Sequence, residues 1–366
     1  MSKKTRVIIS VTNDLVTDQR VNKVATTLIN NNFDVLMIGR KLKNSQEINR
    51  AYQTKRIKLL FNKGALFYAE YNLRLFFVLL FTKFDILNSN DLDTLTANYY
   101  AAKLKGKKIV YDSHEFFTEV PELVNRPKVR KIWLSIEKHI LPKIKKSCTV
   151  SDGIAVEYKN RYGIEMAVIK NFPRKIIVEK ANNEKEEKII IYQGALNLKR
   201  GIDKAIKCMQ YIDNAKLLIV GTGDVEDELK SLTKKLNLNS KVEFTGRIPF
   251  ENLMKITSKA DLGISIEDKA GDNYNFGLPN KLFDYINAEI PVLVASLNEM
   301  LKIINKYKVG EIAVNDNPKD IAKQMIDILN SEEKLKEYSE NCKKAKEELC
   351  WENQEETLLE LYKGEF

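Results

Sequence analysis

The 366-residue sequence is poor in the residues that build most disulfide frameworks and structural zinc sites. It contains two histidines, His114 and His139, and four cysteines at positions 148, 208, 342 and 350, none of which forms a C-x-x-C pair. We therefore expect no metal site. Since no signal peptide follows Met1, we also expect a reduced, intracellular chain.

Two phosphate-binding motifs are absent as well. No G-x-x-x-x-G-K-[ST] loop occurs, and the first predicted strand, at residues 6–12, runs into Thr12-Asn13-Asp14-Leu15 without a glycine. The G-x-G-x-x-G fingerprint of dinucleotide-binding domains is thus missing where it would act. A nicotinamide-dependent enzyme and a P-loop phosphotransferase are both disfavoured.

Long apolar runs are also missing. No stretch of about 18 uninterrupted apolar residues occurs, so on length we expect no membrane-spanning helix. The nearest approach is LRLFFVLLF at residues 73–81, flanked by Glu70 and Lys83. This segment fits either a core helix or a patch that dips into a membrane interface beside basic residues.

Positive charge is abundant, but only in the first half. Residues 1–180 hold 33 Lys and Arg against 17 Asp and Glu, whereas the remainder holds 27 against 33, for a net charge of +10 overall. The first half is therefore expected to face something anionic: nucleic acid, a membrane surface or a phosphorylated lipid. Nucleic acid is disfavoured because no recognition motif or platform of stacking aromatic residues is evident.

Many of these cations gather around one predicted helix at residues 127–145. This helix is predicted either to dock on anionic lipid headgroups or to be an ordinary solvated face. Its basic residues are Arg126, Lys128, Arg130, Lys131, Lys138, Lys143, Lys145 and Lys146.

Strands and helices alternate twice along the chain, which predicts an α/β fold of right-handed βαβ units on parallel sheets. Strands are expected at 6–12, 34–38, 56–60, 85–88, 108–111 and 148–151, and again at 188–192, 216–220, 241–244, 262–266 and 291–295. The polar run 180–188 is the best linker candidate. We predict two domains, 1–175 and 176–350, rather than one eight-fold barrel, whose cadence would be more even.

Three strands of the second half end in glycine. Gly194 follows the strand at 188–192, Gly221-Thr222-Gly223 follows the next, and Gly246-Arg247 follows the third. Lys199 and Arg200 precede a predicted helix. Because ligands bind at the carboxyl ends of parallel strands, these features suit a diphosphate held by backbone N–H groups and cations.

The segment 273–285 adds a second phosphate-binding element. Its glycine, Gly277, leads through a proline into a helix with Asn280 and Lys281 in the first turn and Asp284 one turn later. A helix N-terminus can hold phosphate while a carboxylate accepts hydrogen bonds from ribose, which fits a nucleotide. The alternative is a capped helix with an exposed aspartate.

In the first half, Asp112-Ser113-His114-Glu115 follows the strand at 108–111. A histidine at a strand end can orient a hydroxyl group or shuttle a proton near neutral pH. The alternative is a loop histidine bonded to backbone. His139 lies within the basic helix and is expected to be structural or solvated.

Together these motifs resemble the family 4 (group 1) retaining glycosyltransferases of the GT-B fold, of the bacterial surface-polysaccharide type. The resemblance extends over nearly the whole chain. In the first half it rests on the segments 11–24, 90–94 and 111–116; in the second half it rests on Gly194 to Gly201, Gly221 to Gly223, Phe244 to Arg247 and Leu278 to Tyr285.

The resemblance implies two facing Rossmann-like domains and a C-terminal helix, at about 351–366, that packs back on the first domain. A nucleotide-diphosphate sugar binds the second domain, and a glycan or lipid-linked saccharide acceptor binds the first. The implied reaction retains the anomeric configuration and needs neither metal nor cofactor. The implied location is cytoplasmic, peripheral to the inner face of the membrane.

The resemblance also assigns roles to single residues. His114 is predicted to lie beside the transferred sugar and Glu267 to contact that sugar. The acceptor side is predicted to include Asp18, Arg20, Asp91 and Glu115. The predicted donor-binding residues are Gly194, Lys199, Arg200, Gly221, Gly223, Arg247, Gly277, Asn280, Lys281, Leu282 and Asp284.

Two positions depart from the pattern of the family. Phe276 stands where the first of a pair of acidic residues is expected, and Ala195 stands where an arginine is often found. Two alternatives therefore stay open: a nucleotide-sugar 2-epimerase, and a non-catalytic nucleotide-sugar-binding protein of the same fold. The epimerase would need more acidic residues and histidines than this chain supplies.

Overall fold

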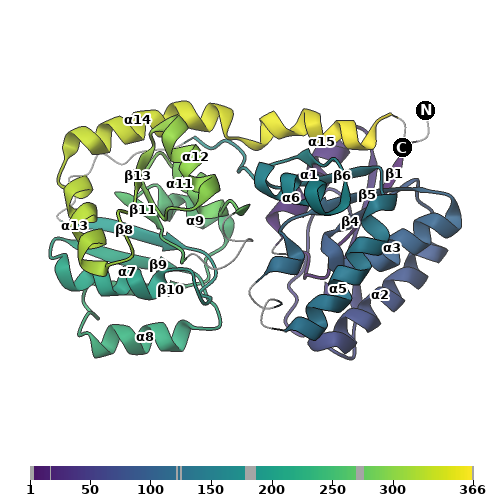
Figure 1. The fold of residues 1–366 in the computed structure, drawn as a ribbon, viewed down its shortest axis with the longest axis horizontal. Coiled ribbons are helices and arrows are strands. Elements are labelled where there is room, and N and C mark those ends of the chain that lie inside the picture. Colours follow the sequence, from purple (N-terminus) through teal and green to yellow (C-terminus); the bar gives the residue numbers. More distant parts are fainter. Residues whose placement is uncertain are drawn as a thin grey trace. The chain divides into compact units, whose positions relative to one another are not determined.

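A computed structural model of the chain describes residues 4–16, 18–120, 123, 126–177, 187–268 and 276–364. The chain divides into two compact units (Figure 1). The first unit is Met1–Asn171 together with Gln354–Phe366, and the second is Phe172–Asn353. Most of the predicted linker at 180–188 lies outside the described residues.

The first unit is built on a seven-stranded parallel sheet. Its strands are β1 (Arg6–Ser10), β2 (Asp34–Lys41), β3 (Gln53–Lys58), β4 (Ile86–Asn90), β5 (Lys108–Ser113), β6 (Lys146–Thr149) and β7 (Ala167–Val168). Their order is β3-β2-β1-β4-β5-β6-β7. The order reverses between β1 and β4, which is where open α/β sheets bind ligands.

Helices flank this sheet. They are α1 (Gln19–Asn30), α2 (Gly64–Phe81), α3 (Asp91–Lys105), α5 (Pro127–Ile140), α6 (Asp152–Tyr162) and α15 (Glu355–Tyr362). Helix α2 lies against α3, and α3 against α5 (Figure 1). The predicted basic helix at 127–145 is shorter than expected: a 3-10 turn, Leu141–Lys143, replaces its end, because Pro142 has no backbone N–H to continue the helix.

The C-terminal helix returns to the first unit, as predicted. Helix α15 packs against α1, where Thr27 donates a hydrogen bond of 2.7 Å to the Glu355 carboxylate. The rings of Phe33 and Tyr362 meet edge to face with centroids 6.1 Å apart. The crossover begins at Gln354, since Trp351 still belongs to the second unit and donates its backbone N–H to the Pro173 carbonyl.

The sequence predicted no helix long and apolar enough to span a membrane. By length and apolar composition, this prediction is wrong. Among the described residues one helix, α2, meets that criterion by length and composition. The expectation failed because two charged residues, Glu70 and Arg74, break the apolar run without lowering the mean hydropathy enough. A core helix can pass the same test, and α2 packs one side against the sheet through Phe67, Tyr71, Leu75 and Leu79.

The second unit has a six-stranded parallel sheet of order β10-β9-β8-β11-β12-β13. Its strands are β8 (Lys188–Gln193), β9 (Ala215–Val220), β10 (Val242–Gly246), β11 (Leu262–Ser265), β12 (Val292–Val294) and β13 (Gly310–Ile312). Its helices are α7 (Ile202–Cys208), α8 (Glu226–Lys235), α9 (Phe250–Thr257), α11 (Asn280–Asn287), α12 (Asn298–Tyr307), α13 (Pro318–Leu329) and α14 (Glu332–Glu348).

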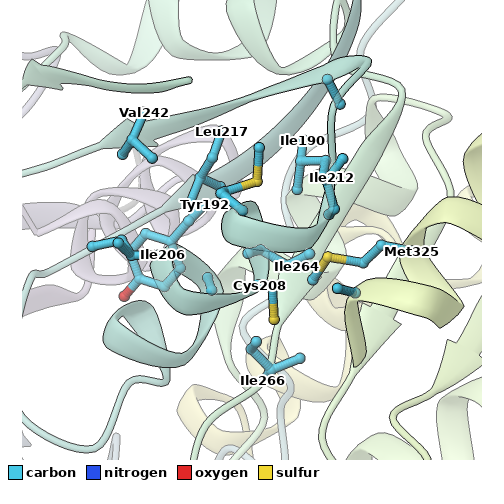
Figure 2. Packing of buried hydrophobic residues seen from close by; sticks show 14 of the residues in the cluster. Ile190, Tyr192, Ile206, Cys208, Ile212, Leu217, Val242, Ile264, Ile266 and Met325 are labelled. Carbon is cyan, nitrogen blue, oxygen red and sulfur yellow. The ribbon is translucent and has the colours of Figure 1, made fainter. Parts of the chain in front are cut away.

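One face of this sheet packs on α7 and α13 (Figure 2). Ile190 and Ile264 from neighbouring strands pack with Ile206 and Cys208 of α7 and with Met325 of α13. The strands are continuous β-branched runs because both faces of a parallel sheet are covered. This rigid layer fixes the ends of β8, β9 and β11, from which the candidate site is built.

Candidate functional site

The predicted glycines of the second unit do lie together at the carboxyl edge of the sheet. The Gly194 N–H donates to the Val220 carbonyl, and the Gly221 N–H donates to the Gly246 carbonyl, both at 2.9 Å. A Cβ on Gly221 would lie 1.9 Å from the Gly194 carbonyl oxygen, and Gly221 has φ +143°. Only glycine fits there, because any side chain would overlap the neighbouring turn.

The loop with Lys199 and Arg200 closes against the end of β11. Gly201, with φ +71°, lets the chain pass so close to Ile266 that a Cβ would lie 2.0 Å from the Ile266 carbonyl oxygen. The Asp268 N–H donates to the Lys199 carbonyl at 3.0 Å, and Lys199 Nζ is 3.6 Å from the Asp268 carboxylate. Lys199 is exposed and Arg200 half-buried. The structure therefore holds the loop with both cations against the end of β11, the strand next to β8.

Helix α11 brings Lys281 to the same edge. Lys281 Nζ forms a buried ion pair of 2.5 Å with Glu267, whose side chain is fully covered, and lies 4.4 Å from the centre of the Tyr192 ring. The Cε atom of Lys281 would be 3.6 Å from a Cβ on Gly194. Lys281 is thus next to the first glycine turn and to Ala195.

Glu267 has its carboxylate occupied by the protein. Ser265 Oγ donates to both oxygens, at 2.9 and 3.1 Å, and Lys281 donates to one of them. A cavity of about 190 Å³ adjoins this residue. The geometry gives Glu267 the immediate task of holding Lys281, which sequence reasoning did not foresee; its predicted contact with a sugar stays a prediction.

Asp284 is oriented by a network of hydrogen bonds. Its carboxylate accepts from Gln193 Nε2 at 2.9 Å, and Gln193 Oε1 accepts from Thr257 at 2.7 Å. The Tyr285 hydroxyl accepts from the Gln193 N–H at 3.1 Å. Gln193, the last residue of β8, was missed in the sequence, although its place directly before Gly194 was a usable signal.

The other predicted donor-binding residues differ in exposure. Asn280 and Arg247 are exposed. Gly277 is half-buried, and Gly223 is exposed next to the Leu196 backbone. Leu282 is different: its side chain is fully buried in the core, so only its main chain can meet a ligand.

In the first unit, β4 and β5 bring the predicted histidine against two carboxylates. Asn90 and Asp112 are paired in the sheet register, so Asp91 follows beside His114. The backbone N–H of His114 donates to the Asp91 carboxylate at 2.8 Å. The imidazole Nδ1 lies 3.6 Å from the Asp91 carboxylate, and Nε2 lies 3.3 Å from the Asp112 carboxylate. Glu115 is exposed beside them.

The surroundings raise the pKa values of His114, Asp91 and Asp93 above their usual values. Burial lowers the pKa of His114, but the charges of Asp112 and Asp91 outweigh it and raise that pKa to about 9. Burial raises the pKa of Asp91 to about 8, with His114 opposing and Glu115 adding to the shift. Burial likewise raises the pKa of Asp93 to about 7, against a hydrogen bond from Thr12. Such clusters are typical of proton-handling sites.

Two predicted acceptor-side residues, Arg20 and Asp18, make structural contacts within the first unit. The Arg20 guanidinium is only 3% exposed; it donates to Asp112 at 2.8 Å and to the Ile169 carbonyl at 2.8 Å. Burial raises the pKa of Asp112, but Arg20 and His114 overcome this and hold it well below its usual range. Asp18 caps α1 by accepting from the Val21 N–H at 3.1 Å. Arg20 therefore acts on His114 through Asp112, and the placement of Arg20 and Asp18 on the acceptor side stays a prediction.

The family can now be stated. Residues 19–172 match the sequence model of Glycosyltransferase Family 4, and residues 173–345 match that of Glycosyl transferases group 1. The chain belongs to this family of glycosyltransferases. The match runs continuously through both units, which accounts for the resemblance seen in the motifs.

Individual relatives agree with this assignment. An uncharacterized glycosyltransferase of Methanocaldococcus jannaschii is 30% identical over 53% of this chain and 48% of its own length. The chain spans about half the length of the curated relatives it matches.

Among the described residues, no group of three or more His, Cys, Asp and Glu side chains is arranged to hold a metal ion.

Solved structures show the GT-B fold. Sucrose-phosphate synthase from Thermosynechococcus elongatus is similar with a TM-score of 0.84 and 15% identity, covering 98% of each chain. HepE of Anabaena, solved in complex with UDP-glucose, has a TM-score of 0.77 and 11% identity over 97% of this chain and 98% of that one. At these identities the likeness concerns the fold.

Proposed function

We propose that this glycosyltransferase moves a sugar from a nucleotide-diphosphate sugar to a hydroxyl group of a glycan or lipid-linked saccharide, with retention of the anomeric configuration. The observation that carries the proposal is the edge of the second sheet, where glycine turns and the buried Lys281 lie together. The glycine turns leave room for a diphosphate beside the cations, and the N-terminus of α11 favours its negative charge. HepE, solved with UDP-glucose, has the same fold.

In the mechanism we propose, positively charged groups accelerate the reaction by stabilising the diphosphate as it leaves. As the glycosidic bond opens, negative charge grows on the leaving diphosphate, and Arg200, Lys281 and backbone N–H groups stabilise it more strongly than in the ground state. Fixed cations in this arrangement make a metal ion unnecessary. Lys281, held by Glu267, supplies from α11 the charge that Ala195 cannot supply from the turn after β8.

The first unit is proposed to hold the acceptor. The pKa of Asp91 is raised to about 8 and that of His114 to about 9, and this pair is suited to binding a hydroxyl group and exchanging a proton with it. Arg20 and Asp112 keep His114 in place. The biological role we propose is synthesis of cell-surface polysaccharide, at the inner face of the membrane.

A donor panel tests the function. Thermal unfolding is followed with UDP, GDP, ADP and their glucose conjugates, and the true nucleotide should raise the midpoint because it binds only the folded chain. Donor turnover is then measured with EDTA present. Arg200→Ala should abolish turnover while the fold is kept; unchanged turnover in this variant would contradict the assignment.

One observation favours a second candidate, a non-catalytic nucleotide-sugar-binding protein. Phe276 stands where the family has an acidic residue, and the Glu267 carboxylate is occupied by Ser265 and Lys281. Donor hydrolysis without acceptor separates the two: a binding protein shows the thermal shift but releases no free sugar. Analysis of the sugar product also excludes or reveals a 2-epimerase.

A further inference from the structure

Helix α2 is apolar on both of its sides, although only one side is covered by protein. The inner stripe Phe67, Tyr71, Leu75 and Leu79 is buried against the sheet. The outer stripe is made of four residues at spacings of seven, four and four, which keep them on one side of the helix. These residues are Leu66, Leu73, Phe77 and Phe81, exposed to 59%, 59%, 50% and 86%. An ordinary surface helix would carry polar residues there.

Neighbouring residues enlarge this apolar surface. Leu60 and Phe61 are exposed in the loop before α2, and Tyr100 and Leu104 are exposed on α3, which lies beside α2 (Figure 1). A gathering of exposed apolar side chains on neighbouring elements is typical of an interaction site. We call it the α2 face: Leu60, Phe61, Leu66, Leu73, Phe77, Phe81, Tyr100 and Leu104.

The backbone around the α2 face is paired within the protein. The Glu70 carboxylate accepts from the N–H groups of Leu60 and Phe61 at 2.9 to 3.0 Å. At the other end, Lys105 Nζ donates to the carbonyls of Leu79, Leu80 and Thr82 at 3.3, 3.0 and 2.7 Å. Unpaired backbone groups are costly outside water. This pairing lets the loop and the helix end enter an apolar layer.

The charges at the ends of the α2 face are positive. Lys63, Lys83, Lys103 and Lys107 are exposed there. The acidic residues of the same stretch are engaged, since Glu70 pairs with Arg74 at 2.7 Å and Asp85 with Lys107 at 3.2 Å. A second copy of the chain would bring these cations against each other, whereas anionic headgroups would neutralise them. Charge complementarity therefore selects a lipid surface over self-association.

We propose that the α2 face docks in the interface of an anionic lipid bilayer. The outer stripe of α2 lies below the headgroups and the lysines lie at their level. Because the inner stripe is packed on the sheet, α2 lies in the plane of the interface and does not cross the bilayer. This site includes the segment 73–81, for which the sequence left a membrane-interface patch open, and it differs from the basic helix at 127–145. It stands independently of the transfer reaction.

Flotation with vesicles tests the proposal. The full chain is mixed with vesicles of phosphatidylcholine alone or with an equal part of phosphatidylglycerol, and it should float with the anionic vesicles. Leu73→Ser/Phe77→Ser/Phe81→Ser should reduce this partitioning by about tenfold or more, since three apolar side chains no longer enter the layer. Replacing Lys83, Lys103 and Lys107 by glutamine should weaken binding to the anionic vesicles only.

Matched variants keep the test sharp. Tyr211→Ser/Val314→Ser removes exposed apolar residues from the second unit, at 47% and 66% exposure, and should float like the wild type. Lys128→Gln/Lys131→Gln on α5 separates the two surfaces. The proposal is overturned if the α2 triple variant, folded by circular dichroism, still floats, if only the α5 variant fails to float, or if sedimentation shows that the triple variant instead dissociates a dimer. The thermal shift with nucleotide is measured separately.

Discussion

At the carboxyl edge of each sheet, a buried charged residue holds a residue of opposite charge in place, and the signs of the two charges are reversed between the units. In the first unit a cation, Arg20, is buried and holds the carboxylate of Asp112 against His114. In the second unit a carboxylate, Glu267, is buried and holds the cation of Lys281 beside the Gly194 turn. The parallel-sheet scaffold is shared, so the residues at the strand ends and in the first turns of α1 and α11 decide which charge the edge presents.

Because their charges differ, the two edges suit different ligands. The carboxylates of Asp91 and Asp93 and the imidazole of His114, whose pKa values are raised to between about 7 and about 9, can exchange protons, which fits a hydroxyl group. Glycine turns and cations fit a diphosphate. A buried ion pair contributes little net stability, but breaking it leaves an uncompensated charge. Each pair is therefore a sensitive place to test the comparison.

The largest effect is expected at Lys281. Lys281→Met leaves Glu267 buried without its cation, so we expect a loss of about 3–5 kcal/mol in the free energy of unfolding and loss of nucleoside diphosphate binding. Denaturant unfolding and calorimetric titration with UDP and GDP measure the two effects.

A second change separates charge from folding. Lys281→Met/Glu267→Gln should recover most of the stability but not the binding, and adding Ala195→Arg should restore binding, because a cation again lies beside the Gly194 turn. Wild-type affinity in the Lys281→Met variant would show that Lys281 does not bind the donor.

Arg20→Met is the matching change in the first unit. It leaves Asp112 without its main partner, and we expect a similar loss of about 3–5 kcal/mol. Nucleotide binding by the second unit should stay unchanged in calorimetric titration. A fall in nucleotide affinity as large as that of Lys281→Met would break the separation between the two edges.

The glycine turns predict an intermediate effect. Gly221→Ala places a Cβ on the Gly194 carbonyl at a φ that other residues rarely adopt, so it should cost at least about 3 kcal/mol and lower nucleotide affinity. Gly246→Ala is the control: its φ is +69°, but no atom lies within 4 Å of the new Cβ, and it should cost only about 1–2 kcal/mol. Equal costs, measured by denaturant unfolding, would count against the close approach.

The smallest effect is the pH dependence of the first edge. The pKa of His114 is about 9 when folded against 6.5 in the unfolded chain, so its protonation stabilises the fold below pH 6.5 and this stabilisation disappears as the pH rises through 9. The stability difference between wild type and His114→Gln should shrink by about 1–2 kcal/mol over that range.

Magnetic resonance gives a direct readout of this titration. With only two histidines in the chain, the His139→Gln variant leaves a single imidazole signal. A titration midpoint for His114 below 6.5 would show that burial, which lowers its pKa, outweighs the charges of Asp112 and Asp91, which raise it.

The sequence alone determined the α/β class, the two sheets, the family and the glycine turns. These features depend on local patterns: β-branched runs, glycines directly after strands and motifs of fixed spacing. The same local reading also placed His114 at a strand end beside carboxylates.

Only the tertiary structure decided what the buried charges do. Arg20 lies 92 residues from Asp112 and Glu267 lies 14 from Lys281, and no pattern in the chain pairs them. Nor could periodicity tell which side of α2 the sheet covers, because both sides are apolar. Ion pairs and exposed faces arise where distant segments meet, and that meeting is set by packing of the whole sheet rather than by neighbours along the chain.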